Sequence, residues 1–155
     1  MINIIEALPG KDQQLMYDVI PYITLLIAGA DGNIDPKELE WSEKITEIRS
    51  FSSHDEWQPY YEKVSETLSS RIQALLAELP EDTAAQGEEL SNRLSKLNDI
   101  LPKLDPLDAK HFYDDLLSFA ERIAKADGGV LGWFTISASE AKVVSLPMIN
   151  PVELP

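Results

Sequence analysis

Apolar residues recur at three- and four-residue steps along almost the whole chain, and this spacing constrains the fold more than any other feature. An α-helix has 3.6 residues per turn, so residues spaced in this way lie on one face and can pack against a core. No stretch of useful length alternates apolar and polar residues as a half-buried strand would. The successive apolar rows are Met16 to Ala30, Leu39 to Ile48, Val64 to Leu79, Leu90 to Leu104 and Phe112 to Ala126. The sequence therefore predicts an all-α fold.

Proline and capping residues set the expected bounds of these helices. Pro21 lies inside the first apolar row and should kink that helix or start its second part. The short link at residues 80–87 predicts that the helices on either side of it are antiparallel neighbours. Further helices are expected from Asp35-Pro36 to about Ser50, from Asp105-Pro106 onward, and from near Ala138 to Pro147.

Size and charge narrow the class of protein. The 155 residues suffice for one domain, 1–155, and the net charge of −14 disfavours nucleic acid and anionic lipid as partners. The chain has no cysteine, which excludes disulfides and zinc-thiolate sites. The most apolar stretch, residues 19–30, is shorter than the ~20 residues that span a bilayer, and the N-terminus lacks the pattern of a signal peptide. We therefore expect a cytoplasmic protein with no direct membrane insertion.

Two short segments repeat at the same offset. Tyr17-Asp18 lies 96 positions before Tyr113-Asp114, and residues 27–32 match residues 123–128 at five of six positions. Two matches in one register predict an internal duplication, with halves of about 11–79 and 88–150. Duplicated helical units commonly pack about a pseudo-twofold axis, which would bring the two Asp-Gly loops together.

The first Asp-Gly loop has the spacing of the second half of a calcium-binding EF-hand loop. Asp31 takes the fifth position, Asp35 the ninth and Glu38 the closing one. Ile27 and Gly29 stand at the first and third positions and offer no side-chain oxygen. This loop should not hold calcium alone.

The second loop supplies the remaining candidate ligands. Asp127 matches Asp31, but Phe134 stands where Glu38 would recur, and Glu140 follows six residues later. We expect any cation to be shared, with Asp31, Asp35 and Glu38 on one side and Asp127 and Glu140 on the other. Ligand sets made only of oxygen favour calcium, magnesium or manganese, and no organic cofactor is expected.

Helix capping explains part of the same pattern. Asp35 and Glu38 suit the N-cap and third positions of a helix, and Ser137 with Glu140 forms a capping box. Asp31 and Asp127 fit less well, because an acid at the C-terminus of a helix meets the negative end of its dipole. Cation binding and turn structure both remain open at this stage.

The same residues resemble a known family. Ala28, Ala30, Asp31, Gly32, Ile34 and Glu38 match the signature of the TerB-like family of tellurite-resistance proteins, and Ala126, Asp127, Gly128 and Glu140 match its looser second copy. The resemblance implies a duplicated multi-helical bundle of about six to eight helices. It also implies acidic loops that bind metal, and work in cytoplasmic stress-response assemblies beside membrane proteins.

The aromatic residues divide into core and surface candidates. Trp133 and Phe134 lie in a loop, and we expect one to pack on the core and the other to be exposed as an anchor for a protein partner. Trp41 and Trp57 have core-like spacing and are expected to be buried.

The remaining polar candidates are predicted to lie at the surface. His54 and His111 are the only histidines, and neither is expected to bind metal or to act in catalysis. Asp18 and Asp114 are expected to face solvent rather than to serve as ligands.

No phosphate-binding glycine loop or nucleophilic triad pattern is present, so we expect no enzyme activity. The first hypothesis is a non-catalytic domain that binds a divalent cation between the two loops. The second is a metal-free adaptor whose acidic face and Trp133 loop dock a basic protein partner. The sequence leaves the oligomeric state open.

Overall fold

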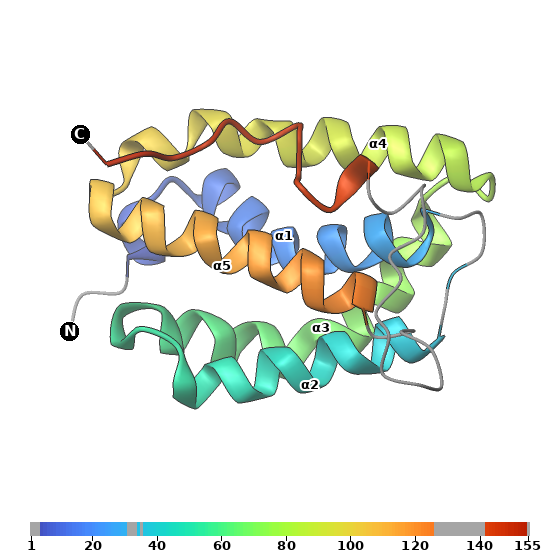
Figure 1. Cartoon of the computed structure of the whole chain (residues 1–155), viewed down its shortest axis with the longest axis horizontal. Helices are drawn as coiled ribbons and strands as arrows, with labels where there is room; N and C mark the ends of the chain where they lie inside the picture. The colour runs from blue at the N-terminus through green and yellow to red at the C-terminus, as the bar shows by residue number, and fades with distance from the viewer. Residues whose placement is uncertain (1–3, 31–33, 35, 126–141, 155) are drawn as a thin grey trace.

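The computed structural model describes residues 4–30, 34, 36–125 and 142–154. Within these residues the structure contains α-helices and short 3-10 helices and no strand, which confirms the all-α prediction. The described residues form five α-helices, which are labelled in Figure 1: α1 (Gly10–Ala28), α2 (Pro36–Ser52), α3 (Gln58–Glu78), α4 (Thr83–Ser95) and α5 (Pro106–Lys125). The helix expected from near Ala138 begins outside the described residues.

Helix α1 forms the centre of the bundle. It contacts each of the other four α-helices, and every residue from Asp18 to Ala28 is buried. A helix that is apolar on all sides must be covered on all sides, which explains why the most hydrophobic stretch of the sequence takes this position. Helix α1 extends through Pro21, so this proline does not start a separate helix.

The other helices surround α1. Helices α2 and α3 form an antiparallel pair on one side of α1, α4 lies on the opposite side, and α5 runs in the same direction as α1 (Figure 1). Helices α3 and α4 are therefore antiparallel, as predicted, but they meet through the ion pair of Glu78 with Arg93, at 2.8 Å, rather than by packing along their lengths. The apolar surface of α1 lies between them and contacts both.

The apolar row from Leu90 to Leu104 does not form one helix. Helix α4 ends at Ser95, and two 3-10 helices follow it, Lys96–Asp99 and Leu101–Lys103. Because a 3-10 helix has three residues per turn, leucines three or four positions apart still face the core. All five leucines of the row are buried.

Burial on α2 differs from the prediction at two positions. Trp41 is 40% exposed and Ile48 is 47% exposed, although both were expected to face the core. Helix α2 packs mainly on α3 and α5, and the residues that meet them include Ile45 and Arg49, so the face carrying Trp41 and Ile48 is directed to solvent. Trp57 is fully buried, as expected.

Asp18 also differs from its prediction. It is only 3% exposed, and its carboxylate accepts two hydrogen bonds from Arg71 of α3, at 2.8 Å from Nε and 3.0 Å from Nη2. Asp114, at the matching position of the repeat, keeps a half-exposed side chain as predicted. The two aspartates differ because α1 is enclosed by its neighbours, whereas α5 has one face open to solvent.

The structure is relevant to two more predictions, the internal repeat and the absence of a membrane span. Helix α5 begins 96 residues after α1 begins, which is the offset of the sequence repeat. No helix in the described part of the chain is long and apolar enough to cross a membrane.

Candidate metal centre

A buried tryptophan fixes the corner between α2 and α3 against α5. Trp57 belongs to a 3-10 helix, Asp55–Trp57, that joins the two helices. Its ring stacks on Phe112 of α5 with centroids 4.5 Å apart, and its Nε1 donates a hydrogen bond to the carbonyl of Asp108 at 3.3 Å. These contacts hold residues 54–57 beside the first turns of α5.

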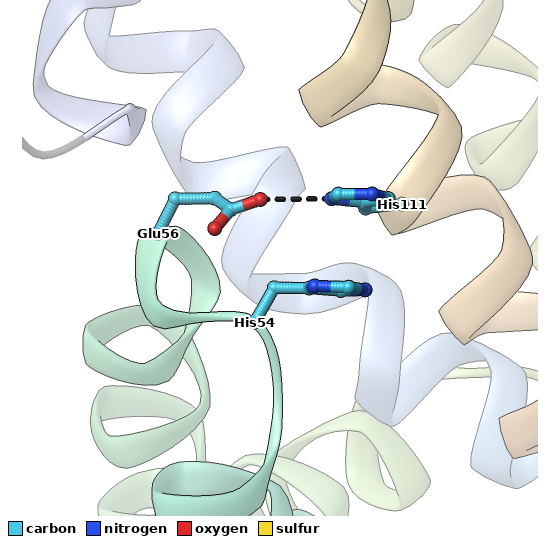
Figure 2. A group of neighbouring side chains, drawn as sticks. All are labelled: His54, Glu56 and His111. Atoms are coloured by element: carbon cyan, nitrogen blue, oxygen red, sulfur yellow. Dashed lines mark hydrogen bonds and ion pairs between the residues drawn. The ribbon is translucent and has the colours of Figure 1, made fainter.

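Backbone hydrogen bonds shape the corner itself. The carbonyl of His54 accepts hydrogen bonds from the backbone N–H groups of Trp57 at 2.8 Å and of Gln58 at 3.2 Å. The side chain of Gln58 donates a further hydrogen bond to the carbonyl of Ser53 at 2.8 Å. His54 and Glu56 are two residues apart in this tight turn, and both side chains are directed toward α5 (Figure 2).

His111 meets this pair from the second turn of α5. Its ring lies parallel to the ring of His54, with centroids 3.6 Å apart and an angle of 5° between the planes. Its Nδ1 lies 2.8 Å from Oε1 of Glu56, as Figure 2 shows. Residues 54 to 56 and residue 111 thus form one cluster, the His54–Glu56–His111 cluster, from segments far apart in the sequence.

The charges around the cluster favour an ionised Glu56. The hydrogen bond from His111 lowers the pKa of Glu56 below its ordinary value of 4.5. Because an ionised carboxylate only accepts hydrogen bonds, Nδ1 of His111 is the donor. Nearby, burial and then the charges of Asp105 and Glu56 raise the pKa of Asp108.

The cluster has the composition and size of a metal centre. Each residue offers a ligand atom, and these atoms all lie within 4.8 Å of one another. Two imidazoles and one carboxylate are a common ligand set for zinc and for non-haem iron. In a tetrahedral zinc site the ligand atoms are about 3.3 Å apart. The three side chains would therefore need to move slightly closer together to bind one ion.

The stacked rings cannot both coordinate one ion without moving. An imidazole binds metal through a lone pair in the plane of its ring, and two parallel planes do not pass through one point. One ring must therefore turn, and His54 is the side chain free to do so because it is exposed, whereas His111 is held by Glu56. We expect metal binding to break the stack.

Most of the residues predicted as metal ligands belong to the two Asp-Gly loops. Asp31, Asp35, Asp127 and Glu140, together with the predicted partner-binding residues Trp133 and Phe134, lie outside the described residues. Glu38 is described, and it is 2% exposed near the start of α2.

The histidine cluster was not predicted from the sequence. His54 and His111 were expected to lie at the surface, with no role in metal binding or catalysis. His111 is in fact partly buried, with 24% of its side chain exposed, and it contacts both members of the other segment. The one available signal was that the only two histidines both lie near helix starts, and pairing those starts required the tertiary fold.

Comparison with known proteins adds no assignment: no protein-family model, curated protein or solved structure matches this chain.

Proposed function

We propose that this chain is a non-catalytic helical domain that binds a divalent transition-metal ion at His54, Glu56 and His111. The observation that carries the proposal is the meeting of the only two histidines with an ionised carboxylate at one rigid corner. The two histidines are 57 positions apart in the sequence, and folding of the helices does not require their side chains to be in contact.

The ligand set suggests which metals to expect. Imidazole nitrogen suits zinc, copper, nickel and iron better than calcium or magnesium. Three protein ligands leave at least one position for water or for a group from a partner, so the ion would be exchangeable. Partial exposure of Glu56 and His111 gives an ion access from solvent.

Thermal melting of the tag-free chain tests the proposal. Zinc at ten times its dissociation constant should add about 1.4 kcal/mol of stability. For a domain of this size that corresponds to a rise in Tm of roughly 3 to 6 °C relative to the chelated protein. His111→Gln should remove the rise, and Asp31→Asn combined with Asp127→Asn is the control that should keep it.

Cobalt(II) provides a second measurement. Because the chain has two histidines and no cysteine, visible absorption from imidazole-bound cobalt reports this cluster alone. The proposal is wrong if zinc, cobalt and nickel all leave the wild-type melting curve unchanged, or if the zinc shift survives His111→Gln.

A second cation site at the Asp-Gly loops remains a proposal, with Asp31, Asp35, Glu38, Asp127 and Glu140 as ligands. Two observations favour it. Helices α1 and α5, which lead into the loops, end at the same end of the bundle (Figure 1), and Glu38 is a buried carboxylate next to one loop. Calcium, magnesium or manganese should raise Tm in the wild type and not in Asp31→Asn with Asp127→Asn. The ends of α1 and α5 that lead into the loops lie at the opposite end of the bundle from the corner between α2 and α3 (Figure 1), so each site can be tested separately.

Membership of the TerB-like family is likewise a proposal, based on the sequence resemblance. It would place the chain among duplicated helical domains of tellurite and stress-response assemblies, with a membrane-associated protein complex as partner. The offset of 96 residues between the starts of α1 and α5 is in keeping with a duplication.

The alternative function is a metal-free acidic adaptor. Trp41, Ile48 and Phe51 favour it, because they are 40%, 47% and 68% exposed along α2 in a chain of net charge −14. This combination suits a basic amphipathic helix as partner. A wild-type Tm that is indifferent to every cation, with basic-peptide binding that Trp41→Ala weakens, would favour this function.

A further inference from the structure

A hollow beside His54 collects positive charge in an otherwise acidic protein. It lies between the C-terminal half of α2 and the middle of α5 and has a volume of about 330 Å³. Arg49, Arg122 and His54 line it, and among the described residues Asp115 is the only acidic one in its wall. We call it the Arg49 hollow.

The two arginines of the hollow differ from the other two in the chain. Arg71 is paired with Asp18, and Arg93 is paired with Glu78 and Glu89. In the described part of the chain, neither Arg49 nor Arg122 lies within ion-pair distance of a carboxylate. In a chain with 27 acidic residues, two arginines in one hollow that form no ion pair among the described residues require an explanation.

Arg49 is held in place by neutral groups. Its guanidinium donates hydrogen bonds to the carbonyl of Asp115 at 2.8 Å, to Oγ of Ser118 at 2.7 Å and to the hydroxyl of Tyr61 at 3.4 Å. It also lies over the ring of Phe119. Arg49 is 8% exposed, and a buried charge is costly when its partners are all neutral. Three of its five N–H donors are used in this way, and the other two have no hydrogen-bond partner among the described residues.

The carboxylate of Asp115 does not neutralise this charge directly. Its Oδ2 accepts hydrogen bonds from the hydroxyl of Tyr61 at 3.0 Å and from Oγ of Ser53 at 3.1 Å. These bonds direct the carboxylate to Tyr61 and Ser53. Among the described residues of the wall, Arg49 and Arg122 carry positive charges and Asp115 carries one negative charge.

We propose that the Arg49 hollow binds a small phosphomonoester through Arg49, Arg122 and the hydroxyl of Ser52. The guanidinium fork matches phosphate oxygens, and a doubly charged phosphate balances two arginines better than a carboxylate does. Ile45 and Ile48 form an apolar wall for an organic group. The volume is at the lower end of the range for small-molecule sites, and the net charge of −14 opposes a polyanion.

Chemical-shift titration of the ¹⁵N-labelled, chelated protein tests this proposal without the metal centre. Inorganic phosphate and phosphoserine are the probes, and chloride at matched ionic strength is the reference. Signals lining the hollow should shift saturably, with Kd values in the ~millimolar range. Arg122→Gln should weaken binding about tenfold, because this exposed side chain supplies one of the two charges. Lys96→Gln, which removes an equal exposed charge outside the hollow, should change Kd less than about twofold.

The probes also separate the sources of the phosphate group. Tighter binding of phosphoserine supports a phosphorylated organic ligand, and equal binding supports free phosphate as the occupant. The proposal is overturned if the Arg122→Gln and Lys96→Gln variants bind phosphate with the same Kd. It is also overturned if chloride shifts the same signals as strongly as phosphate does. Because neither arginine is a metal ligand, a negative result here leaves the zinc measurements intact.

Discussion

The imidazole rings of His54 and His111 lie face to face, with centroids 3.6 Å apart and planes within 5° of parallel. Only His111 is hydrogen-bonded to Glu56. This asymmetry gives the two histidines different roles, since His111 is anchored and His54 is able to turn.

The hydrogen bond between Glu56 and His111 should make stability depend on acid pH. The pKa of Glu56 is lower in the folded protein than its ordinary value of 4.5, so the fold favours the ionised carboxylate. The stabilisation is therefore complete above the ordinary pKa and is lost as the pH falls through the lowered one. Glu56→Gln should flatten this part of the pH profile, measured as the free energy of unfolding in urea between about pH 6 and pH 3.

Glu66→Gln is the matched control for that experiment. Glu66 is an exposed glutamate on α3 to which the structure assigns no hydrogen bond among the described residues. Its substitution should leave the pH profile as in the wild type. If both substitutions change the pH profile equally, the loss of any acidic residue causes the change, and the contact of Glu56 with His111 does not.

Metal binding through Nδ1 of His111 should change the tautomer of this ring. In the metal-free protein Nδ1 donates its proton to Glu56, and a nitrogen that binds metal carries no proton. In a neutral imidazole the proton then moves to Nε2 of the same ring. Two-dimensional ¹H–¹⁵N spectra of the ring nitrogens, recorded with and without zinc, show which nitrogen carries the proton. A His111 ring that keeps its proton on Nδ1 in the zinc-bound protein would contradict a ligand role for Nδ1.

Trp57→Phe should destabilise the protein and weaken the metal site together. The substitution removes the hydrogen bond from Nε1 to the carbonyl of Asp108 and leaves a gap in a fully buried position. We expect a loss of about 2 kcal/mol in the free energy of unfolding, together with weaker zinc binding because the corner is no longer fixed against α5.

Trp41→Phe provides the same chemical change at an exposed position. Trp41 is 40% exposed, so its substitution should change stability by less than about 0.5 kcal/mol and should not affect zinc binding. Similar losses from both substitutions would indicate that the contacts of Trp57 do not set the geometry of the cluster.

Arg71→Met should leave Asp18 buried without its cation. Asp18 has a side chain that is 5% exposed, and the pair is bidentate. Because Arg71 itself is 33% exposed, we expect a cost of about 2 kcal/mol, below that of a fully buried pair. Asp18→Asn added to Arg71→Met should recover part of that cost in a double-mutant cycle by urea unfolding.

Lys44→Met is the control, because it removes an ion pair at the surface. Lys44 lies 3.7 Å from Glu40, and both side chains are more than half exposed. Its loss should cost less than about 0.5 kcal/mol. If Arg71→Met costs no more than Lys44→Met, the burial of Asp18 adds little to the stabilisation by its ion pair.

The helical period determined the class of the fold and most of its elements. Apolar spacing located the helices, and the Asp-Pro pairs located the starts of α2 and α5 at Pro36 and Pro106. These signals are local: they depend on residues within one or two turns, so one sequence is enough to detect them. The same period could not separate Trp41 from Trp57, because it does not say which side of a helix meets a neighbour.

The tertiary structure alone decided which polar residues meet. His54 and His111 form a cluster only because Trp57 docks the corner after α2 onto α5. Asp18 is buried, and Asp114 is not, because α1 is enclosed on all sides while α5 is not. Contacts between segments more than fifty residues apart depend on how whole helices pack, and no periodicity within a single segment encodes that packing.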